Sequence, residues 1–195
     1  MIKINPMEIK GNWVYGEALD FHTTSSTHMG QNEYGHDVWD TIRPPIAELL
    51  YQLKYKNNRE ALNQIVTTAA NHLKRSNAIF DCIVPVPSSA NRAFPPALEI
   101  AKGIGRILGI DVNDCIEKTR QSSELKGVTD PDERQRLLSG LYKVEENTLE
   151  DLKVLLIDDL YRSGSTMSHI TDVLYQQGQA KSVFTLAITK TRTNR

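Results

Sequence analysis

Two adjacent carboxylates follow an apolar run late in the chain and are the first candidates for chemistry. Residues 154–157 are all apolar, and Asp158 and Asp159 come directly after them. A continuous apolar run of this kind is typical of a buried strand in a parallel sheet. At the carboxyl end of such a strand, where open α/β sheets bind ligands, carboxylates can accept hydrogen bonds from the vicinal hydroxyls of a ribose.

A loop of small hydroxyl residues follows the carboxylates and leads into a predicted helix over residues 166–177. The free amides at a helix N-terminus attract anions, and Gly164 lets the backbone approach a ligand closely. Arg162 adds a positive charge to this loop, and hydroxyl groups come from Ser163, Ser165 and Thr166. The loop therefore predicts a phosphate site, and phosphate and diol together predict a ribose 5-phosphate.

Two other interpretations of this segment stay open. The aspartates can cap a loop while the serines and the glycine form an ordinary turn, as in many α/β proteins. A receiver domain also gathers carboxylates at strand ends, but its acidic pair belongs to the first strand. Here the pair follows a late strand and leads directly into the anion loop, which favours the sugar-phosphate interpretation.

The elements that must position these residues alternate between short apolar runs and helical patterns. This alternation predicts an α/β fold with a parallel sheet covered by helices on both faces. Helices are expected at 42–53, 59–75, 97–108 and 166–177, and strands at 79–86, 110–116, 140–144, 154–157 and 182–188. Residues 1–41 lack this pattern, so we expect a small N-terminal appendage on a core of residues 42–195.

Composition and charge narrow the classes of function. Hydrophobic residues make up 39% and charged residues 24% of the chain, as in folded soluble proteins, and no apolar run approaches the roughly 20 residues that cross a bilayer. The 23 Lys+Arg against 24 Asp+Glu give a net charge of -1, which does not support nucleic-acid binding. Two distant cysteines, Cys82 and Cys115, and the absence of a leader-like start make a cytoplasmic location the expectation.

One connection is too long and too polar to be a routine loop. Residues 118–132 are rich in charged and turn-forming residues. Long connections of this kind often act as lids over active sites. The sequence therefore predicts a mobile loop beside the candidate sugar-phosphate site.

The segment from 154 to 166 resembles the signature of the type I phosphoribosyltransferases. That signature is an apolar strand, two acidic residues and a Ser/Thr/Gly loop that binds 5-phosphoribosyl 1-diphosphate (PRPP). Two positions depart from the usual pattern, since Tyr161 stands in place of an aliphatic residue and Arg162 in place of a small one. The phosphate contacts can therefore differ from those of the family, and Arg162 can strengthen them.

Residues 42–190 are similar, motif by motif, to the competence protein F-like members of this family. The shared motifs are Leu53-Lys54-Tyr55-Lys56, Ile83-Val84-Pro85-Val86-Pro87 with Arg92, Arg134, and Gly140-Leu141-Tyr142. Those relatives usually open with a four-cysteine zinc ribbon, whereas this chain has no cysteine before Cys82. The usual Gly-Phe-Asn is also replaced, by Ala93-Phe94-Pro95. These departures bear on any role in DNA uptake more than on a nucleotide-sugar pocket.

The resemblance implies a glycosyltransferase that moves the phosphoribosyl group of PRPP to a nitrogen acceptor and releases diphosphate. Asp158 and Asp159 would be catalytic, and residues 162–166 would bind the 5-phosphate. The diphosphate would be bound by Pro87, Ser88, Ser89 and Arg92, and a flexible loop would supply Lys118, Arg120, Lys126 and Arg134. Mg²⁺ would be held mainly through PRPP, with no direct protein ligand, and the appendage would act as a hood.

Several alternatives stay open. A plain turn also explains the prolines around residue 87, and Arg92 can be a surface residue. As a second hypothesis, the chain is a non-catalytic PRPP or nucleotide sensor, or an accessory protein in DNA handling. The acceptor is not identified by the sequence, and a homodimer is the commonest form if the protein oligomerises.

Two further groups of residues have competing interpretations. Three histidines in the first 41 residues suggest a metal site, but their spacing matches no standard zinc pattern and exposed loop positions are favoured; they are His22, His28 and His36. Lys54 and Lys56 could contact a phosphate, although the basic outer face of a helix explains them adequately.

Overall fold

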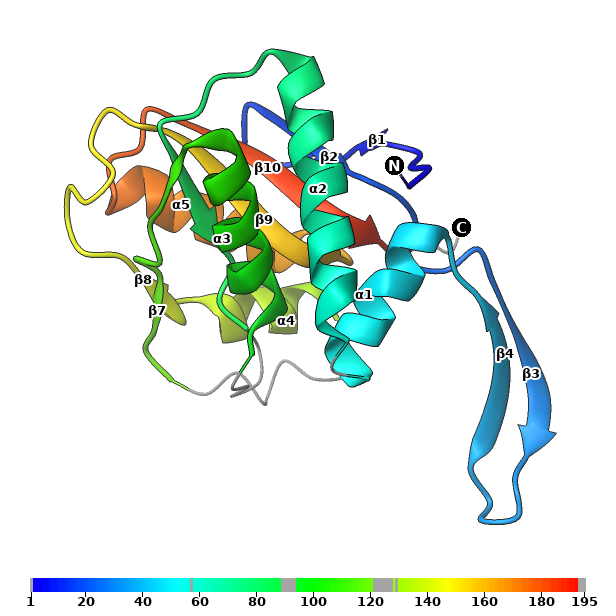
Figure 1. Ribbon diagram of the computed structural model, residues 1–195. Helices are drawn as coiled ribbons and strands as arrows, with labels where there is room; N and C mark the ends of the chain where they lie inside the picture. The colour runs from blue at the N-terminus through cyan, green and yellow to red at the C-terminus, as the bar shows by residue number, and fades with distance from the viewer. Residues whose placement is uncertain (1, 57, 89–93, 121–127, 129, 193–195) are drawn as a thin grey trace.

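The computed structural model describes residues 2–56, 58–88, 94–120, 128 and 130–192. At its centre is a six-stranded sheet in the order β1-β2-β10-β9-β5-β6 (Figure 1). Neighbouring strands are parallel, except that β1 pairs antiparallel with β2 at one edge. The strands are β1 (Met7–Glu8), β2 (Tyr15–Ala18), β5 (Cys82–Pro85), β6 (Asp111–Val112), β9 (Lys153–Tyr161) and β10 (Ser182–Lys190).

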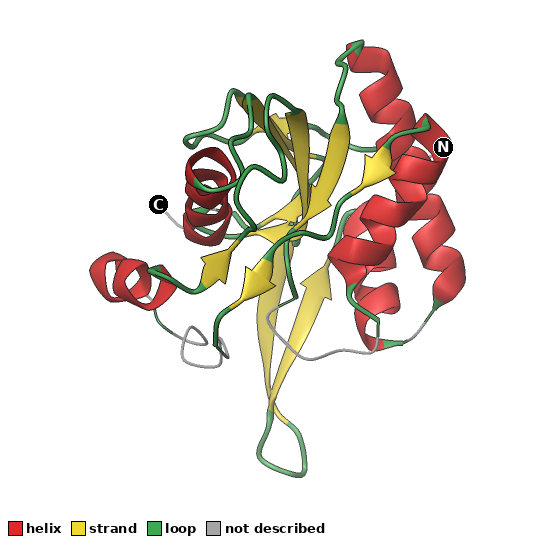
Figure 2. Ribbon diagram, turned by 90° about the vertical axis from the view of Figure 1, so that its left-hand side faces the viewer, coloured by secondary structure: helices red, strands yellow, loops and turns green. Residues whose placement is uncertain are grey.

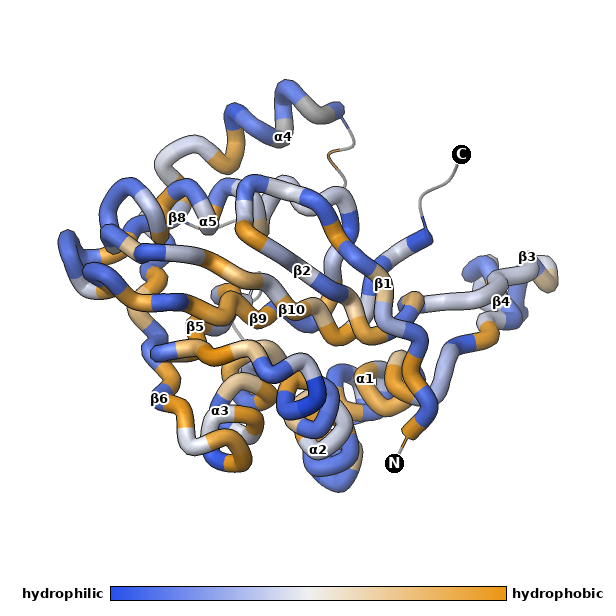
Figure 3. Tube along the Cα trace, turned by 90° about the horizontal axis from the view of Figure 1, so that it is seen from above, coloured by the Kyte–Doolittle hydropathy of each residue, from blue (hydrophilic) through white to orange (hydrophobic). Residues whose placement is uncertain are grey.

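Helices cover both faces of this sheet, as Figures 2 and 3 show. One face carries α1 (Pro45–Tyr55), α2 (Arg59–Ser76) and α3 (Pro96–Leu108), and the other carries α4 (Pro131–Leu138) and α5 (Ser165–Gln176). Alternate residues of β9 divide between the two layers, since Leu155 and Ile157 pack with α1 to α3 while Val154 and Leu156 pack with α5. The predicted α/β fold with a parallel sheet flanked by helices is confirmed. In the described part of the chain, no helix is both long and apolar enough to span a bilayer.

The three helices on the first face form a tightly packed layer. Asn58 caps α2 by accepting a hydrogen bond from the amide of Glu60 at 3.0 Å, which is a preferred way to begin a helix. A Cβ atom on Gly103 of α3 would lie 2.5 Å from the side chain of Val66 of α2. Glycine is therefore required for α2 and α3 to approach this closely, and the same layer holds α1 against the sheet.

The first 41 residues divide between the main sheet and a projecting hairpin. Strand β2 lies parallel to β10, whereas β3 (Ser25–Gln31) and β4 (Asp37–Ile42) pair antiparallel and extend away from the body (Figure 1). The hairpin exposes apolar side chains, including Met29, Tyr34 and Trp39. The domain boundary expected after residue 41 stays a prediction, and the structure adds that β1 and β2 belong to the main sheet.

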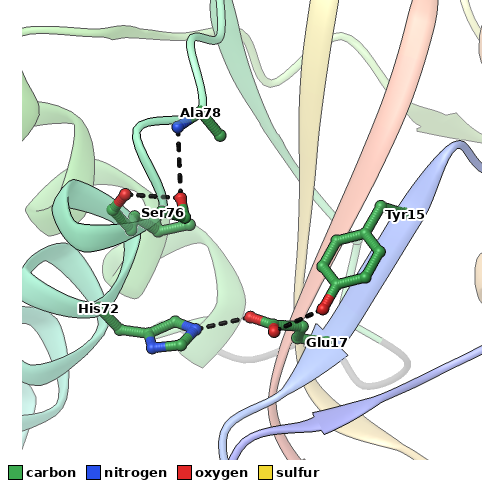
Figure 4. Close-up of polar contacts among 6 residues, drawn as sticks. Tyr15, Glu17, His72, Ser76 and Ala78 are labelled. Carbon is green, nitrogen blue, oxygen red and sulfur yellow. Dashed lines mark hydrogen bonds and ion pairs between the residues drawn. The ribbon is translucent and has the colours of Figure 1, made fainter.

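A polar link joins β2 to α2 (Figure 4). Glu17 accepts a hydrogen bond from the Tyr15 hydroxyl at 2.7 Å, and its other carboxylate oxygen lies 2.6 Å from His72 Nε2. The hydrogen bond to Glu17 raises the pKa of Tyr15 to about 12. Burial works to raise the pKa of Glu17, but the contacts with Tyr15 and His72 outweigh it and the pKa is lowered. At the end of α2, the Ala78 amide donates to Ser76 Oγ at 3.3 Å.

Three elements differ from those expected. Helix α4 lies where the end of the polar loop was predicted, and it begins at Asp130, whose carboxylate accepts the Glu133 amide at 2.8 Å. The expected strand at 110–116 shrinks to β6, because the chain leaves the sheet and pairs antiparallel farther on, through β7 (Glu117–Lys118) and β8 (Tyr142–Lys143). Strand β9 continues to Tyr161, because residues beyond 157 still pair with β10, so both aspartates lie within the strand.

Candidate active site

Asp158 and Asp159 lie on β9, near its C-terminal end and between β5 and β10. Asp158 Oδ1 accepts a hydrogen bond from the backbone amide of Asp159 at 2.7 Å, which fixes the side chain against its own strand. Burial, with a further contribution from the neighbouring Asp159 carboxylate, raises the pKa of Asp158 to about 7. The pair therefore carries less than its full negative charge at neutral pH.

Helix α1 contributes a cation that the sequence did not assign to the site. Lys54 Nζ lies 2.7 Å from Asp159 Oδ2, and the two side chains are only 12% and 18% exposed. Two signals were available: Lys54 follows Leu53, which is buried on the inner face of the helix, and both residues belong to the Leu53-Lys54-Tyr55-Lys56 motif. Nothing in the sequence connects that position to Asp159, because α1 reaches β9 only through tertiary packing.

A second set of hydrogen bonds near Asp159 involves residues of β10 and of the segment after β2. The Thr189 hydroxyl donates to the Asp159 carbonyl oxygen at 3.2 Å, and His22 Nδ1 lies 3.1 Å from the same hydroxyl. Because the hydroxyl has a single hydrogen, His22 Nδ1 must be the donor to Thr189. The pKa of His22 is lowered, first by burial and then by three cations, Lys54, Arg43 and Arg162. His22 is therefore neutral at pH 7.

The histidines of the first 41 residues do not gather at one place. His28 Nε2 lies 3.2 Å from Asp37 Oδ1 on the projecting hairpin, whereas His22 contacts β10. Across the residues that the structure describes, no group of three or more His, Cys, Asp or Glu side chains could hold a metal ion.

The anion loop lies at the N-terminus of α5, directly after β9. Gly164 is the N-cap residue with φ +81°, and a Cβ there would lie 2.5 Å from the Tyr161 hydroxyl oxygen, so glycine is needed for two reasons. The hydroxyl oxygens of Ser163 and Ser165 lie 2.9 Å apart. The first turn of α5 contains no acidic residue and its N-cap makes no side-chain hydrogen bond. Its amide dipoles therefore favour a bound anion.

Three further residues complete the surroundings of this loop. Arg162 is exposed and Thr166 is half-buried in the first turn of α5. Tyr161, which departs from the family pattern, lies against Gly164 and makes an edge contact with the buried ring of Trp13, with 6.4 Å between the ring centroids. Tyr161 therefore supports the loop from the protein side.

The loop after β5 lies beside β9 and is joined to the base of the polar connection. The Val86 amide donates to the Ile157 carbonyl at 2.8 Å, and Pro87 and Ser88 follow as half-buried residues. Lys118 Nζ donates a hydrogen bond to the Ser88 carbonyl oxygen. Burial lowers the pKa of Lys118. The loop assigned to the diphosphate and the first residue assigned to the flexible loop are thus in direct contact.

The other cations assigned to the flexible loop are placed differently. The Arg120 guanidinium donates to the carbonyl oxygens of Leu137 at 2.8 Å and Ser139 at 3.1 Å, which caps the C-terminal end of α4. Ser89, Arg92, Lys126 and the side chain of Arg134 lie outside the described residues. The roles assigned to these residues stay predictions.

Comparison with curated proteins gives a distant relative. The chain is 24% identical over 145 residues to competence protein F of Haemophilus influenzae, a match that covers 69% of this chain and 63% of that protein. The chain thus matches less than two thirds of the length of this relative. No family model matches the chain.

Solved structures with a similar arrangement include two phosphoribosyltransferases. An adenine phosphoribosyltransferase is 12% identical with a TM-score of 0.47, and the match covers 86% of each chain. A purine phosphoribosyltransferase from Pyrococcus horikoshii Ot3 is 16% identical with a TM-score of 0.43, over 66% of this chain and 81% of that one. Both TM-scores are below 0.5, so these structures add nothing beyond general architecture. The resemblance to competence protein F, which the sequence motifs predicted, is confirmed by the sequence match to that protein.

Proposed function

We propose that this chain is a phosphoribosyltransferase that binds PRPP and transfers its phosphoribosyl group to a nitrogen acceptor. The observation that carries the proposal is the succession, on one strand end, of a diol acceptor and an anion site. Asp158 and Asp159 on β9 are followed by a glycine loop that leads into α5, and the N-cap residue of that helix, Gly164, makes no side-chain hydrogen bond. In this proposal the carboxylates hold the ribose hydroxyls and the loop holds the 5-phosphate of a single ligand.

The second phosphate-bearing end of PRPP has candidate partners next to this strand. The loop containing Pro87 and Ser88 follows β5, the neighbour of β9 in the sheet. Lys118 contacts the Ser88 carbonyl, which brings a cation to this loop. A diphosphate placed here would therefore lie next to β9, beside the carboxylate pair.

The reaction needs little covalent chemistry from the protein. The bond between C1 of the ribose and diphosphate breaks, a bond from C1 to the acceptor nitrogen forms, and the acceptor gives up its proton. Carboxylates beside the ring stabilise the positive charge that develops on the sugar in the transition state. Asp158 and Asp159 also hold the sugar by accepting hydrogen bonds from its hydroxyls, which limits its motion during transfer.

The donor set at this strand end fits a magnesium ion bound through PRPP. Asp159 is already paired with Lys54, and the described residues offer no cluster of three metal-binding side chains. The ion would thus be carried by oxygens of PRPP. PRPP itself would be held by Asp158, Asp159 and the loop that contains Ser88. Mg²⁺ bound in this way neutralises charge on the diphosphate leaving group.

The test is calorimetric titration of the protein with PRPP, with and without Mg²⁺. We expect magnesium-dependent binding that is lost in Asp158→Asn/Asp159→Asn and kept in Asp114→Asn, which removes an exposed aspartate elsewhere. Absence of binding by folded wild-type protein would refute the proposal.

A positive titration justifies a second measurement with acceptors. Purines, pyrimidines and pyridines would be tested for diphosphate release in the presence of PRPP and Mg²⁺. Release with any of them shows catalysis. Tight PRPP binding without release across the set would instead favour the sensor hypothesis.

A further inference from the structure

The ion pair between α1 and β9 is buried in the candidate site. Lys54 Nζ and Asp159 Oδ2 are 2.7 Å apart, with side chains 12% and 18% exposed. Exposed ion pairs contribute little because water screens them. Both partners of this pair are largely removed from water, so removing either one would leave an uncompensated charge in the site.

The other charged and titratable groups around Asp159 have different positions. Asp158 is its neighbour on β9, and Arg162 at the end of that strand is exposed. His22, from the segment after β2, is neutral at pH 7 because its pKa is lowered by burial and nearby cations. Arg43, which precedes α1, stacks its guanidinium 4.3 Å from the ring centre of Tyr51 and lies 3.8 Å from Glu48. Among the described residues, the ion pair to Asp159 is therefore made by Lys54.

Two adjacent carboxylates in one partly buried place cannot both ionise at low cost. The Asp159 charge helps to raise the pKa of Asp158, and Lys54 acts in the opposite direction on the same group. A carboxylate has about four lone-pair positions, so Asp159 can accept a ribose hydroxyl while it is held by Lys54. The ammonium group also limits rotation of the Asp159 side chain.

We propose that Lys54 is a positioning residue of this site, whose ammonium group holds the Asp159 carboxylate in the orientation in which it accepts a hydrogen bond from the ribose diol. This inference rests on the proposed function and names a residue outside the acidic pair and the phosphate loops. Because Lys54 belongs to α1, sugar binding then also depends on how α1 packs against the sheet.

The first test compares Lys54→Met, which keeps most of the aliphatic length, with Lys54→Arg, which keeps the charge. Affinity for PRPP with Mg²⁺ is measured by calorimetry from pH 7 to 9. Lys54→Met should bind at least ~10-fold more weakly at pH 7, since loss of a close cation raises a carboxyl pKa by about one unit or more. Its affinity should recover toward pH 9 as the pair loses its proton, whereas the wild-type affinity should rise only about two-fold, because Asp158, with a pKa of about 7, is already about half ionised at pH 7.

Two controls separate positioning from structural damage. Lys54→Arg should restore most of the affinity, and Lys56→Met, an exposed lysine at the end of the same helix, should leave it unchanged. A loss in Lys54→Met that is equal at every pH, or no loss at all, would overturn the inference. Thermal unfolding of each variant shows whether it is folded at the temperature of the titration.

A ligand-free measurement distinguishes failure of this inference from failure of the proposed function. In protein labelled with ¹³C-aspartate, the Asp158 carboxyl resonance should titrate at a higher pH in Lys54→Met than in the wild type, because Lys54 opposes the rise in the pKa of Asp158. PRPP binding by the wild type, together with an Asp158 resonance whose titration is unshifted in the variant, refutes the role of Lys54 alone. Absence of PRPP binding by the wild type refutes the proposed function, and the role of Lys54 in it.

Discussion

Replacing Asp158 by Asn should stabilise the protein while destroying its affinity for PRPP. Burial and the Asp159 charge raise the pKa of Asp158 from 3.8 to about 7. The folded protein therefore holds this proton over a pH range in which the unfolded chain has lost it. Stability falls as pH rises from about 4 to about 7 and levels off above that, because a group with a raised carboxyl pKa favours the folded state only at low pH.

The size of the effect follows from the same shift. A rise of about three pKa units corresponds to a cost of about 4 kcal/mol at pH 8, at 1.36 kcal/mol per unit. The amide of Asn can still accept the hydrogen bond that the Asp159 amide gives to Asp158 Oδ1 at 2.7 Å. Burying the amide has a cost of its own, so we expect Asp158→Asn to gain about half of that maximum, about 2 kcal/mol.

The assay is urea denaturation followed by circular dichroism at several pH values from 5.5 to 8.5. The free energy of unfolding of Asp158→Asn should exceed that of the wild type by an amount that grows with pH and is constant above about pH 7 to 8. Asp114→Asn removes the same charge from an exposed position. Its free energy of unfolding should not show a difference from the wild type that grows with pH. A destabilised Asp158→Asn protein at pH 8, or a difference that does not depend on pH, would refute the reasoning.

Three other perturbations test neighbouring parts of the structure. Gly164→Ala should lower stability by about 1 to 3 kcal/mol and weaken PRPP binding, because φ is +81° and the new Cβ meets Tyr161; chemical denaturation and calorimetry check this, and unchanged values in both would contradict it. In the Glu17 contact with His72, the lowered carboxyl pKa adds stability that is present above about pH 4.3 and lost as pH falls further, so in urea titrations Glu17→Gln should destabilise the protein at pH 7 by an amount that shrinks as the pH falls below about 4.3. Burial raises the pKa of Cys82 to about 11, so iodoacetamide should label it slowly at pH 7.5 by mass spectrometry, and rapid labelling of the folded protein would argue against this burial.

Local patterns in the sequence were enough to predict the parts of the site that are close together along the chain. The apolar run that ends at residue 157, the two aspartates and the glycine loop before α5 all appear where they were expected. Helix α2 likewise follows from its apolar spacing, with an asparagine cap at its start. These features depend on periodicity and on the conformations of individual residues, which neighbours along the chain largely determine.

Elements with few apolar residues were predicted less well. Helix α4 buries little besides Leu138, so its apolar spacing is too sparse to distinguish it from a loop. The available signal was Asp130 followed by Pro131, which is a common helix start. Strand β2 has only four residues, and its place in the sheet comes from pairing with β10, at the other end of the chain.

The sequence by itself determined the local arrangement of the candidate site: an acidic pair near the end of a buried strand and a glycine loop before the next helix. Only the tertiary structure decided which charged and titratable side chains surround the acidic pair. Lys54 and His22 belong to segments that precede Asp159 by more than half the chain. Helix packing brings Lys54 to the Asp159 carboxylate, and His22 is linked to the Asp159 backbone through Thr189 of β10. Such contacts depend on how whole elements pack around a common core, so the spacing of residues along any one element cannot predict them.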